Sequence, residues 1–164
     1  MYDEKKIEAY KFLSILLANK FDVFYKTPKL GNKIITNKLS LKDDSNVLQI
    51  DPIFKELKKF RVQELTNYSH ALQSANIVIV TYPQTTVFDL VYLDIPFVMF
   101  LEPEEWDLTR ISMNWYDKFC SFGLAYRYSE YKELYTAILN KKIVSTFYSK
   151  EFRIFRKEFL DFIT

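Results

Sequence analysis

Residues 74–100 constrain the fold more than any other part of the chain. They read as an apolar strand, SANIVIV, a threonine-rich turn, TYPQTT, a short helix, VFDLVYLD, and a second strand opened by proline, IPFVMF. The run from Ile77 to Val80 shows no polar alternation, which is typical of a parallel strand covered on both faces. In open α/β sheets the ligand crevice lies beyond the carboxyl ends of the strands, so the turn after Val80 is the first place to look for a site.

Helical and extended patterns alternate along the rest of the chain. Residues 3–19 place Ile7, Tyr10, Leu13 and Leu17 at helical spacing, which predicts an amphipathic helix. Further strands are predicted over residues 21–25, 47–50, 61–63 and 124–126, and further helices over 52–60, 66–74, 102–122, 129–139 (capped by Ser129) and 149–162, with a loop over 29–46. The alternation predicts an α/β fold, a Rossmann-like three-layer α/β/α sandwich with a mainly parallel sheet of about five or six strands.

Length, charge and cysteine content restrict the class of protein. The 164 residues, 49% of them hydrophobic, suffice for one core, and we expect a single domain over residues 1–164. A net charge of +2 from 23 basic and 21 acidic residues gives no general attraction to nucleic acid, so no nucleic-acid partner is expected. Cys120 is the only cysteine, which excludes an intrachain disulfide and favours the cytoplasm. No apolar run approaches the roughly 20 residues of a membrane-spanning helix.

Glycine, histidine and cysteine are too scarce for several common sites. The only two glycines, Gly31 and Gly123, exclude a three-glycine dinucleotide fingerprint, and their separation excludes a Walker-type phosphate loop. Because His70 is the only histidine and Cys120 is the only cysteine, we expect neither a zinc site of the usual types nor a self-contained Cys/His catalytic pair. We therefore expect no metal and no cofactor.

The threonine-rich turn is the first candidate site. Thr86 and Asp89 have the spacing of a capping box, which by itself accounts for both residues. A threonine-rich turn after a buried parallel strand also suits phosphate oxygens, because it offers hydroxyls and unpaired backbone amides. The two roles are compatible. Asp89 would cap the turn or accept from a ligand hydroxyl, since one carboxylate is too few for a metal.

Lys26 is the second candidate. It follows the predicted strand over residues 21–25 directly, and Pro28 stiffens the turn behind it. A lysine at the same edge of the sheet supplies the positive charge that a diphosphate needs. The alternative is a solvated surface lysine.

The segment from Ala75 to Phe100 resembles the donor-binding half of GT-B glycosyltransferases, closest to the surface-polysaccharide group that includes the CDP-glycerol glycerophosphotransferases. That group places a hydroxyl-rich pair after a similar strand, then an acidic residue, then a proline that opens the next strand. The matching residues are Thr85, Thr86, Asp89 and Pro96. Lys26-Thr27-Pro28 is similar to an earlier basic His-Pro motif of these families but lacks the histidine. The resemblance is strongest over residues 61–139.

The resemblance implies a role in surface-carbohydrate biosynthesis. Thr81, Gln84, Thr85 and Thr86 would hold the diphosphate of a nucleotide-sugar or nucleotide-diphospho-polyol donor, with Lys26 neutralising it and Asp89 beside them. GT-B enzymes bring the acceptor and the catalytic base from an N-terminal domain, so the chain would be the C-terminal half of a two-domain or split transferase. It would bind donor yet stay inactive without its partner. No catalytic residue is assigned.

Two alternatives remain open: a non-catalytic interaction module, and a free-standing hydrolase or epimerase, which the single histidine and the single candidate acid of the crevice disfavour. The chain can instead be a non-catalytic α/β interaction module that docks through its aromatic surface or its final helix. That helix, over residues 149–162, carries Phe152, Phe155, Phe159 and Phe162 on one face, with basic residues nearby. This face can pack on the core, cross to the missing domain, or dock on a membrane surface as a peripheral contact.

Overall fold

The structure is a computed structural model and describes residues 4–25, 63–64, 72, 75–81 and 85–163. The chain divides into two compact units, Met1–Gln73 and Ser74–Thr164. The expectation of a single domain stays a prediction. Several further predictions lie outside the described residues: the loop over 29–46, the strand over 47–50, the helix over 52–60, most of the helix over 66–74, and the placement of Lys26, His70 and Gln84.

The first unit contains helix α1 (Glu4–Ala18) and the parallel strands β1 (Phe24–Tyr25) and β2 (Gln63–Glu64). Phe24 pairs with Gln63 in this two-stranded sheet. Helix α1 buries Ala9, Tyr10, Leu13 and Leu17, which recur every three or four residues and therefore share one face. The predicted helix is confirmed, with Tyr10, Leu13 and Leu17 of its predicted apolar face buried and Ile7 half-buried. The strands predicted over 21–25 and 61–63 are present in part.

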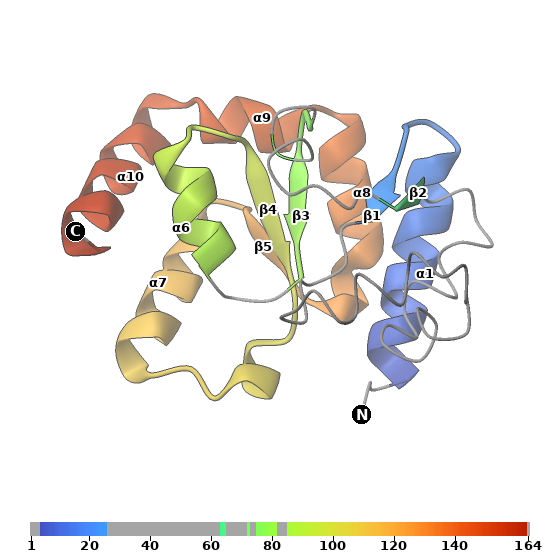
Figure 1. Cartoon of the computed structure of the whole chain (residues 1–164), viewed down its shortest axis with the longest axis horizontal. Helices are drawn as coiled ribbons and strands as arrows, with labels where there is room; N and C mark the ends of the chain where they lie inside the picture. Colours follow the sequence, from blue (N-terminus) through green and yellow to red (C-terminus); the bar gives the residue numbers. More distant parts are fainter. Residues whose placement is uncertain (1–3, 26–62, 65–71, 73–74, 82–84, 164) are drawn as a thin grey trace, which may run out of the picture. The chain divides into compact units, whose positions relative to one another are not determined.

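The second unit is built on a parallel sheet of strands β3 (Val78–Val80), β4 (Phe97–Phe100) and β5 (Ala125–Tyr126), in that order (Figure 1). Val78 pairs with Phe97, and Phe100 pairs with Tyr126. All four residues of β4 are buried, as expected of a central strand. In β3 Val80 is buried while Val78 and Ile79 are half-buried, so the predicted strand is present but is not fully covered on both faces.

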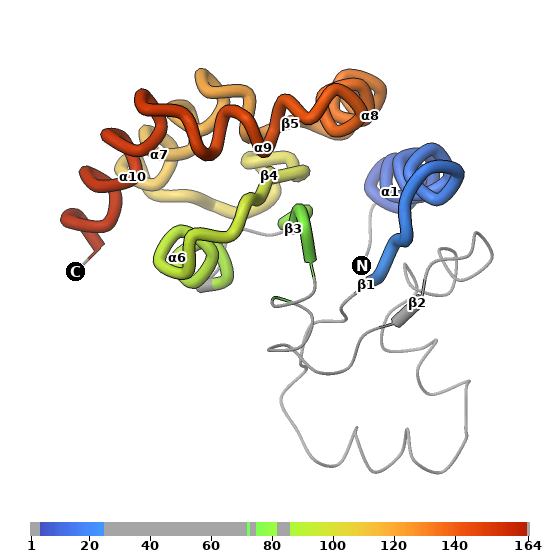
Figure 2. The backbone as a smooth tube through the Cα atoms, turned by 90° about the horizontal axis from the view of Figure 1, so that it is seen from above, coloured from blue at the N-terminus to red at the C-terminus, as the bar shows by residue number. Residues whose placement is uncertain are grey.

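Helices lie on both sides of this sheet. Helix α6 (Thr85–Tyr92), helix α7 (Arg110–Ser121) and helix α10 (Lys150–Ile163) lie on one side, and helix α8 (Tyr131–Leu139) lies on the other (Figure 2). Helix α9 (Lys142–Phe147) and two short 3₁₀ helices, η1 (Pro103–Trp106) and η2 (Tyr128–Glu130), complete the described part of the unit. No described helix is long and apolar enough to cross a membrane.

The expected α/β class with a parallel sheet is confirmed. A sheet of five or six strands is not shown, because the described residues of the second unit form three strands and the β1–β2 pair belongs to the first. Helix α9 was not predicted; it has only six residues, too few for periodicity to reveal, yet it buries Ile143 and Phe147.

Two predicted helix caps are wrong. Helix α6 begins at Thr85, so Thr86 lies inside the first turn and does not start a Thr86–Asp89 capping box. Ser129 lies inside η2 and does not cap α8. Glu130 instead stabilises the turn before α8, because its side-chain Oε1 accepts the Arg127 N–H at 2.9 Å.

Candidate functional site

The carboxyl ends of the three parallel strands share one edge of the sheet (Figure 1). Thr81 follows β3, Glu102 follows β4 after one residue, and Arg127 follows β5 directly. This is the edge at which open α/β sheets hold their ligands. The first turn of α6 also lies here, because the chain passes from the end of β3 into the start of α6 within four residues.

The start of α6 is suited to an anion. Thr85 and Thr86 occupy its first two positions, where the backbone N–H groups have no partner within the helix. The first turn contains no acidic residue, so no carboxylate within that turn offsets the positive end of the helix dipole. Three buried side chains hold the helix against the core: Val87, Leu90 and Val91.

The structure describes some of the predicted phosphate-binding residues and not others. Thr81 is half-buried directly after β3, Thr86 is half-buried in the first turn of α6, and Asp89 is exposed one turn further along. The backbone of Thr85 is described as the start of α6. Gln84 and Lys26 lie outside the described residues, so their part in the site stays a prediction.

An ion-pair network that was not predicted joins the ends of β4 and β5. The Nη1 atom of Arg127 donates to Oε2 of Glu102 at 2.8 Å, and Nη1 and Nη2 donate to the two carboxylate oxygens of Glu104 at 2.8 and 2.7 Å. Glu102 also accepts the backbone N–H of Tyr128 at 2.8 Å. Through these bonds Glu102 and Arg127 fix the loop after β4 to the loop after β5.

The hydrogen bonds of the network shift two pKa values in opposite directions. The paired Glu104 raises the pKa of the Arg127 guanidinium, and Arg127 lowers the pKa of Glu104. Because this pKa is lowered, Glu104 contributes to the free energy of unfolding above its unfolded pKa, about 4.3, and the contribution is lost as the pH falls. Since Glu104 is largely exposed, solvent screening keeps this contribution small.

The two halves of the edge therefore differ in charge. Beyond β4 and β5, four glutamates surround the one arginine of the network: Glu102, Glu104, Glu105 and Glu130. The start of α6, after β3, presents amides and hydroxyls with no acid in its first turn. An anionic group is favoured at α6 and repelled beside η1.

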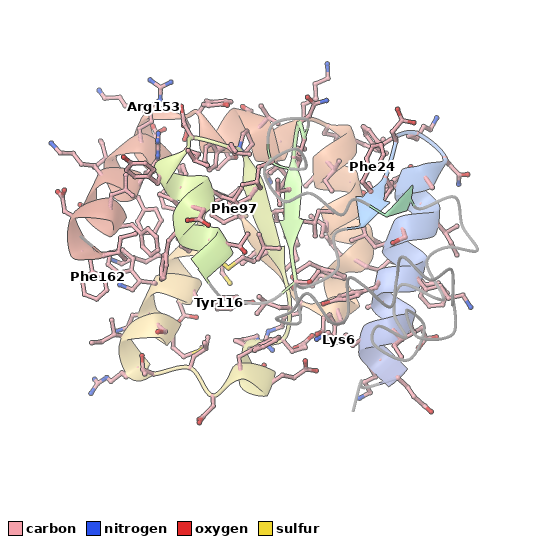
Figure 3. All side chains as sticks on the ribbon, viewed as in Figure 1. Lys6, Phe24, Phe97, Tyr116, Arg153 and Phe162 are labelled. Carbon is pink, nitrogen blue, oxygen red and sulfur yellow. The ribbon has the colours of Figure 1, made fainter. Side chains whose placement is uncertain are left out.

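A buried tyrosine lies near the network. Tyr116 on α7, labelled in Figure 3, is 5% exposed. Its hydroxyl has no hydrogen-bond partner of ordinary strength among the described residues. The weakly polar thiol of Cys120, one turn along α7, lies beside it. Burial is the main cause that raises the pKa of Tyr116 and also that of Cys120. The raised pKa disfavours the thiolate form of Cys120, which is the nucleophilic form of a cysteine.

Replacing Tyr116 by phenylalanine is expected to leave the protein as stable or to stabilise it by up to about 1 kcal/mol, because the change removes a buried hydroxyl without a strong partner. Because the pKa of Tyr116 is raised in the folded state, ionisation of the unfolded chain lowers the stability of the unchanged protein as the pH rises above 10, and Tyr116→Phe should escape this loss. Urea unfolding at neutral pH and at pH 11 or so measures both effects. A large loss of stability in Tyr116→Phe at neutral pH would show that the hydroxyl is strongly bonded.

No group of three or more His, Cys, Asp or Glu is placed to hold a metal ion in the part of the chain that the structure describes. In a comparison with protein families, the model of a family described as "LIC12162 family transferase" matches residues 24–162. No curated protein and no solved structure matches the chain.

Proposed function

The chain belongs to the LIC12162 family of transferases, and from this premise we propose that it binds a nucleotide-diphosphate-linked donor as the C-terminal half of a GT-B-type transferase. The donor is a nucleotide sugar or a nucleotide-diphospho-polyol, of the kind used by CDP-glycerol glycerophosphotransferase-like enzymes of surface-carbohydrate biosynthesis. In this proposal the chain folds as one Rossmann-like sandwich of five or six strands and acts in the cytoplasm. Membership of a transferase family favours this proposal over a non-catalytic interaction module.

The start of α6 is the observation that carries the proposal. It brings two consecutive threonines and the first amides of a helix to the carboxyl edge of a parallel sheet, and its first turn contains no competing acid. Hydrogen bonds from backbone amides and hydroxyls to charged phosphate oxygens are strong, so this turn suits a diphosphate. The acidic network of Arg127 beyond β4 and β5 directs the phosphates to the α6 half of the edge.

Each predicted residue has a role in this proposal. Thr81, Gln84, Thr85 and Thr86 hold the diphosphate, Lys26 neutralises it, and Asp89 accepts from a donor hydroxyl or fixes the turn. The acceptor and the catalytic base come from an N-terminal domain or subunit. The chain on its own therefore binds donor without turning it over, because transfer requires both reactants to be held together.

Replacing Thr85 and Thr86 together by valine is expected to abolish donor binding while leaving the domain folded. Valine keeps the size and branching of threonine but removes the two hydroxyls. Isothermal titration with the nucleoside diphosphate that the unchanged chain binds measures the affinity, and circular dichroism measures the fold.

Thr136→Val is the matched control, because Thr136 lies on α8 and its hydroxyl donates to the Lys132 carbonyl at 3.0 Å, within its own helix. The control should bind like the unchanged chain. Unchanged affinity in the Thr85/Thr86 variant would remove these residues from the site.

A further inference from the structure

The C-terminal end of α6 is closed by a residue in a conformation that favours glycine. Asp94 has a φ of 60°, in the left-handed region. Its backbone N–H donates to the Val91 carbonyl at 3.4 Å, and the Ile95 N–H donates to the Leu90 carbonyl at 3.0 Å. These two bonds form a Schellman motif, whose left-handed position is usually a glycine. A residue with a side chain is less favourable there and depends on its surroundings to hold it.

Arg156 on α10 holds this end of α6 in two ways. Its Nε donates to the Val91 carbonyl at 2.9 Å, and its Nη1 lies 2.7 Å from Oδ1 of Asp94. The Tyr148 hydroxyl also donates to the Asp94 carbonyl, at a longer 3.4 Å. The Arg156 side chain is only 20% exposed, so solvent screens its contacts less than those of an open surface. Arg156 therefore fixes both a last-turn carbonyl of α6 and the left-handed residue that follows the helix.

Helix α10 is itself fixed to the core. Phe152, Phe155 and Phe159, three of the four phenylalanines of its predicted apolar face, are buried. Of the roles that the sequence leaves open for this face, packing on the core is the one observed for these three rings. Phe159 also contacts Phe88 of α6, with ring centroids 5.8 Å apart. Because Phe88 lies nearer the start of α6 than Val91 does, α6 touches α10 at two points along its length (Figures 1 and 2).

The proposed anion site and the contacts of Arg156 lie at opposite ends of α6. The helix has eight residues and spans about 12 Å, with Thr85 and Thr86 in its first turn and Asp94 just past its last. A rigid secondary element of this kind can carry energetic coupling between its two ends. A change in how α10 holds Asp94 therefore reaches the first amides of α6.

We propose that Arg156 is a positioning residue for the anion site at the start of α6. This inference rests on the proposed function, since the anion is the diphosphate of the donor. Hydrogen bonds to phosphate oxygens weaken when their length or direction changes. By holding Val91 and Asp94, Arg156 keeps the first amides of α6 aimed at one place without touching the ligand. The ligand must in turn affect the contacts of Arg156, because coupling between two sites acts equally in both directions.

A nucleotide titration of the full chain, read by NMR at an arginine side chain, tests this coupling without any substitution. UDP, CDP or GDP, whichever the chain binds, should shift the Arg156 Nε–H signal with the same Kd as the Thr86 amide. Arg153 is the control, because it is exposed one turn earlier on α10, and its Nε–H signal should not follow that curve. If Arg156 only stabilises the fold, its signal will not move, and that result would overturn the proposal.

Substitutions test the same coupling through the affinity for the nucleotide. Arg156→Met should weaken binding roughly tenfold, about the effect of one lost charge-assisted hydrogen bond. Arg156→Lys keeps the charge but cannot make both contacts, so its affinity should fall between the two. Circular dichroism checks that each variant is folded at the temperature of the titration. Should Arg156→Met not fold, Arg156→Lys and the Arg156 signal of the unchanged chain decide the question.

Leu134→Ala is the matched control for a loss of stability. Leu134 is fully buried on α8, on the other side of the sheet from α6, so its truncation leaves a cavity away from the site. This variant should bind the nucleotide like the unchanged chain. Equal weakening in Leu134→Ala would overturn the proposal, because the affinity would then follow stability rather than the position of α6.

The outcomes separate this proposal from the proposed function. A chain that binds none of the three nucleotides would contradict both. A chain that binds one of them, with Arg156→Met at the affinity of the unchanged chain, would overturn the positioning role alone. A loss confined to the Arg156 variants, together with one Kd at the Arg156 and Thr86 signals, would support it.

Discussion

Replacing Phe152 by alanine is expected to lower the free energy of unfolding by about 3–5 kcal/mol. Phe152 on α10 is fully buried, and its ring centroid lies 5.0 Å from that of Phe147 and 5.4 Å from that of Phe122. It also contacts Phe119 and Phe155. Alanine would leave a cavity among four rings that the surrounding helices cannot close without losing their own contacts.

Phe162→Ala on the same helix is the matched control. Phe162 is 55% exposed and touches Trp115 at one edge of the cluster, with ring centroids 5.2 Å apart, so the same substitution should cost less than about 1 kcal/mol. Urea unfolding followed by circular dichroism measures both variants. Equal costs for the two positions would contradict the packing of α10 described above.

Replacing Arg156 by methionine is expected to lower the free energy of unfolding by about 2–3 kcal/mol. Methionine keeps the aliphatic stem but removes the charged hydrogen bond to the Val91 carbonyl, one of the last carbonyls of α6. It also removes the ion pair with Asp94, which holds a left-handed conformation with φ of 60° where α6 ends. Loss of Arg156 thus loosens α6 from α10 at the point where the chain turns into β4.

Arg153→Met, one turn earlier on α10, is the control for this substitution. Arg153 is exposed, and its loss should change the stability by less than about 0.5 kcal/mol. Asp94→Asn should cost less than about 1 kcal/mol, because the Asp94 carboxylate is half exposed. Thermal unfolding should show the largest loss of stability for Arg156→Met, a smaller loss for Asp94→Asn and the smallest loss for Arg153→Met. A different order would show that Arg156 does not hold α6 to α10.

The order of elements after Ser74 could be predicted from local patterns. The apolar runs around β3 and β4, the turn between them and the phenylalanine spacing of α10 each extend over enough residues to show their period. The threonines of α6 could be predicted as a candidate site because they lie in the turn that follows a strand. The exact start of α6 could not be predicted, since a threonine can begin a helix from either of two adjacent positions.

Contacts between distant residues could not be predicted in this way. Glu102 and Arg127 are separated by 25 residues and meet because β4 and β5 are parallel neighbours. Both residues follow strands, so the rule that sites lie beyond the carboxyl ends of parallel strands applies to them as well. It could not be used for Arg127, because Leu124–Tyr126 alone is a weak strand pattern. The burial of Tyr116 depends on helix packing that no local pattern specifies.

A backbone-amide NMR titration of the chain with UDP, CDP, GDP and CMP tests the central claim most directly. The proposal predicts saturable shifts with one of these nucleotides at Lys26 and from Thr81 to Asp89, together with a gain in stability of about 2.7 kcal/mol at 100 times the Kd. Those shifts would establish donor binding at the start of α6 and identify the base. A well-folded sample that shows no shift with any of the four would contradict the proposal and favour the non-catalytic interaction module.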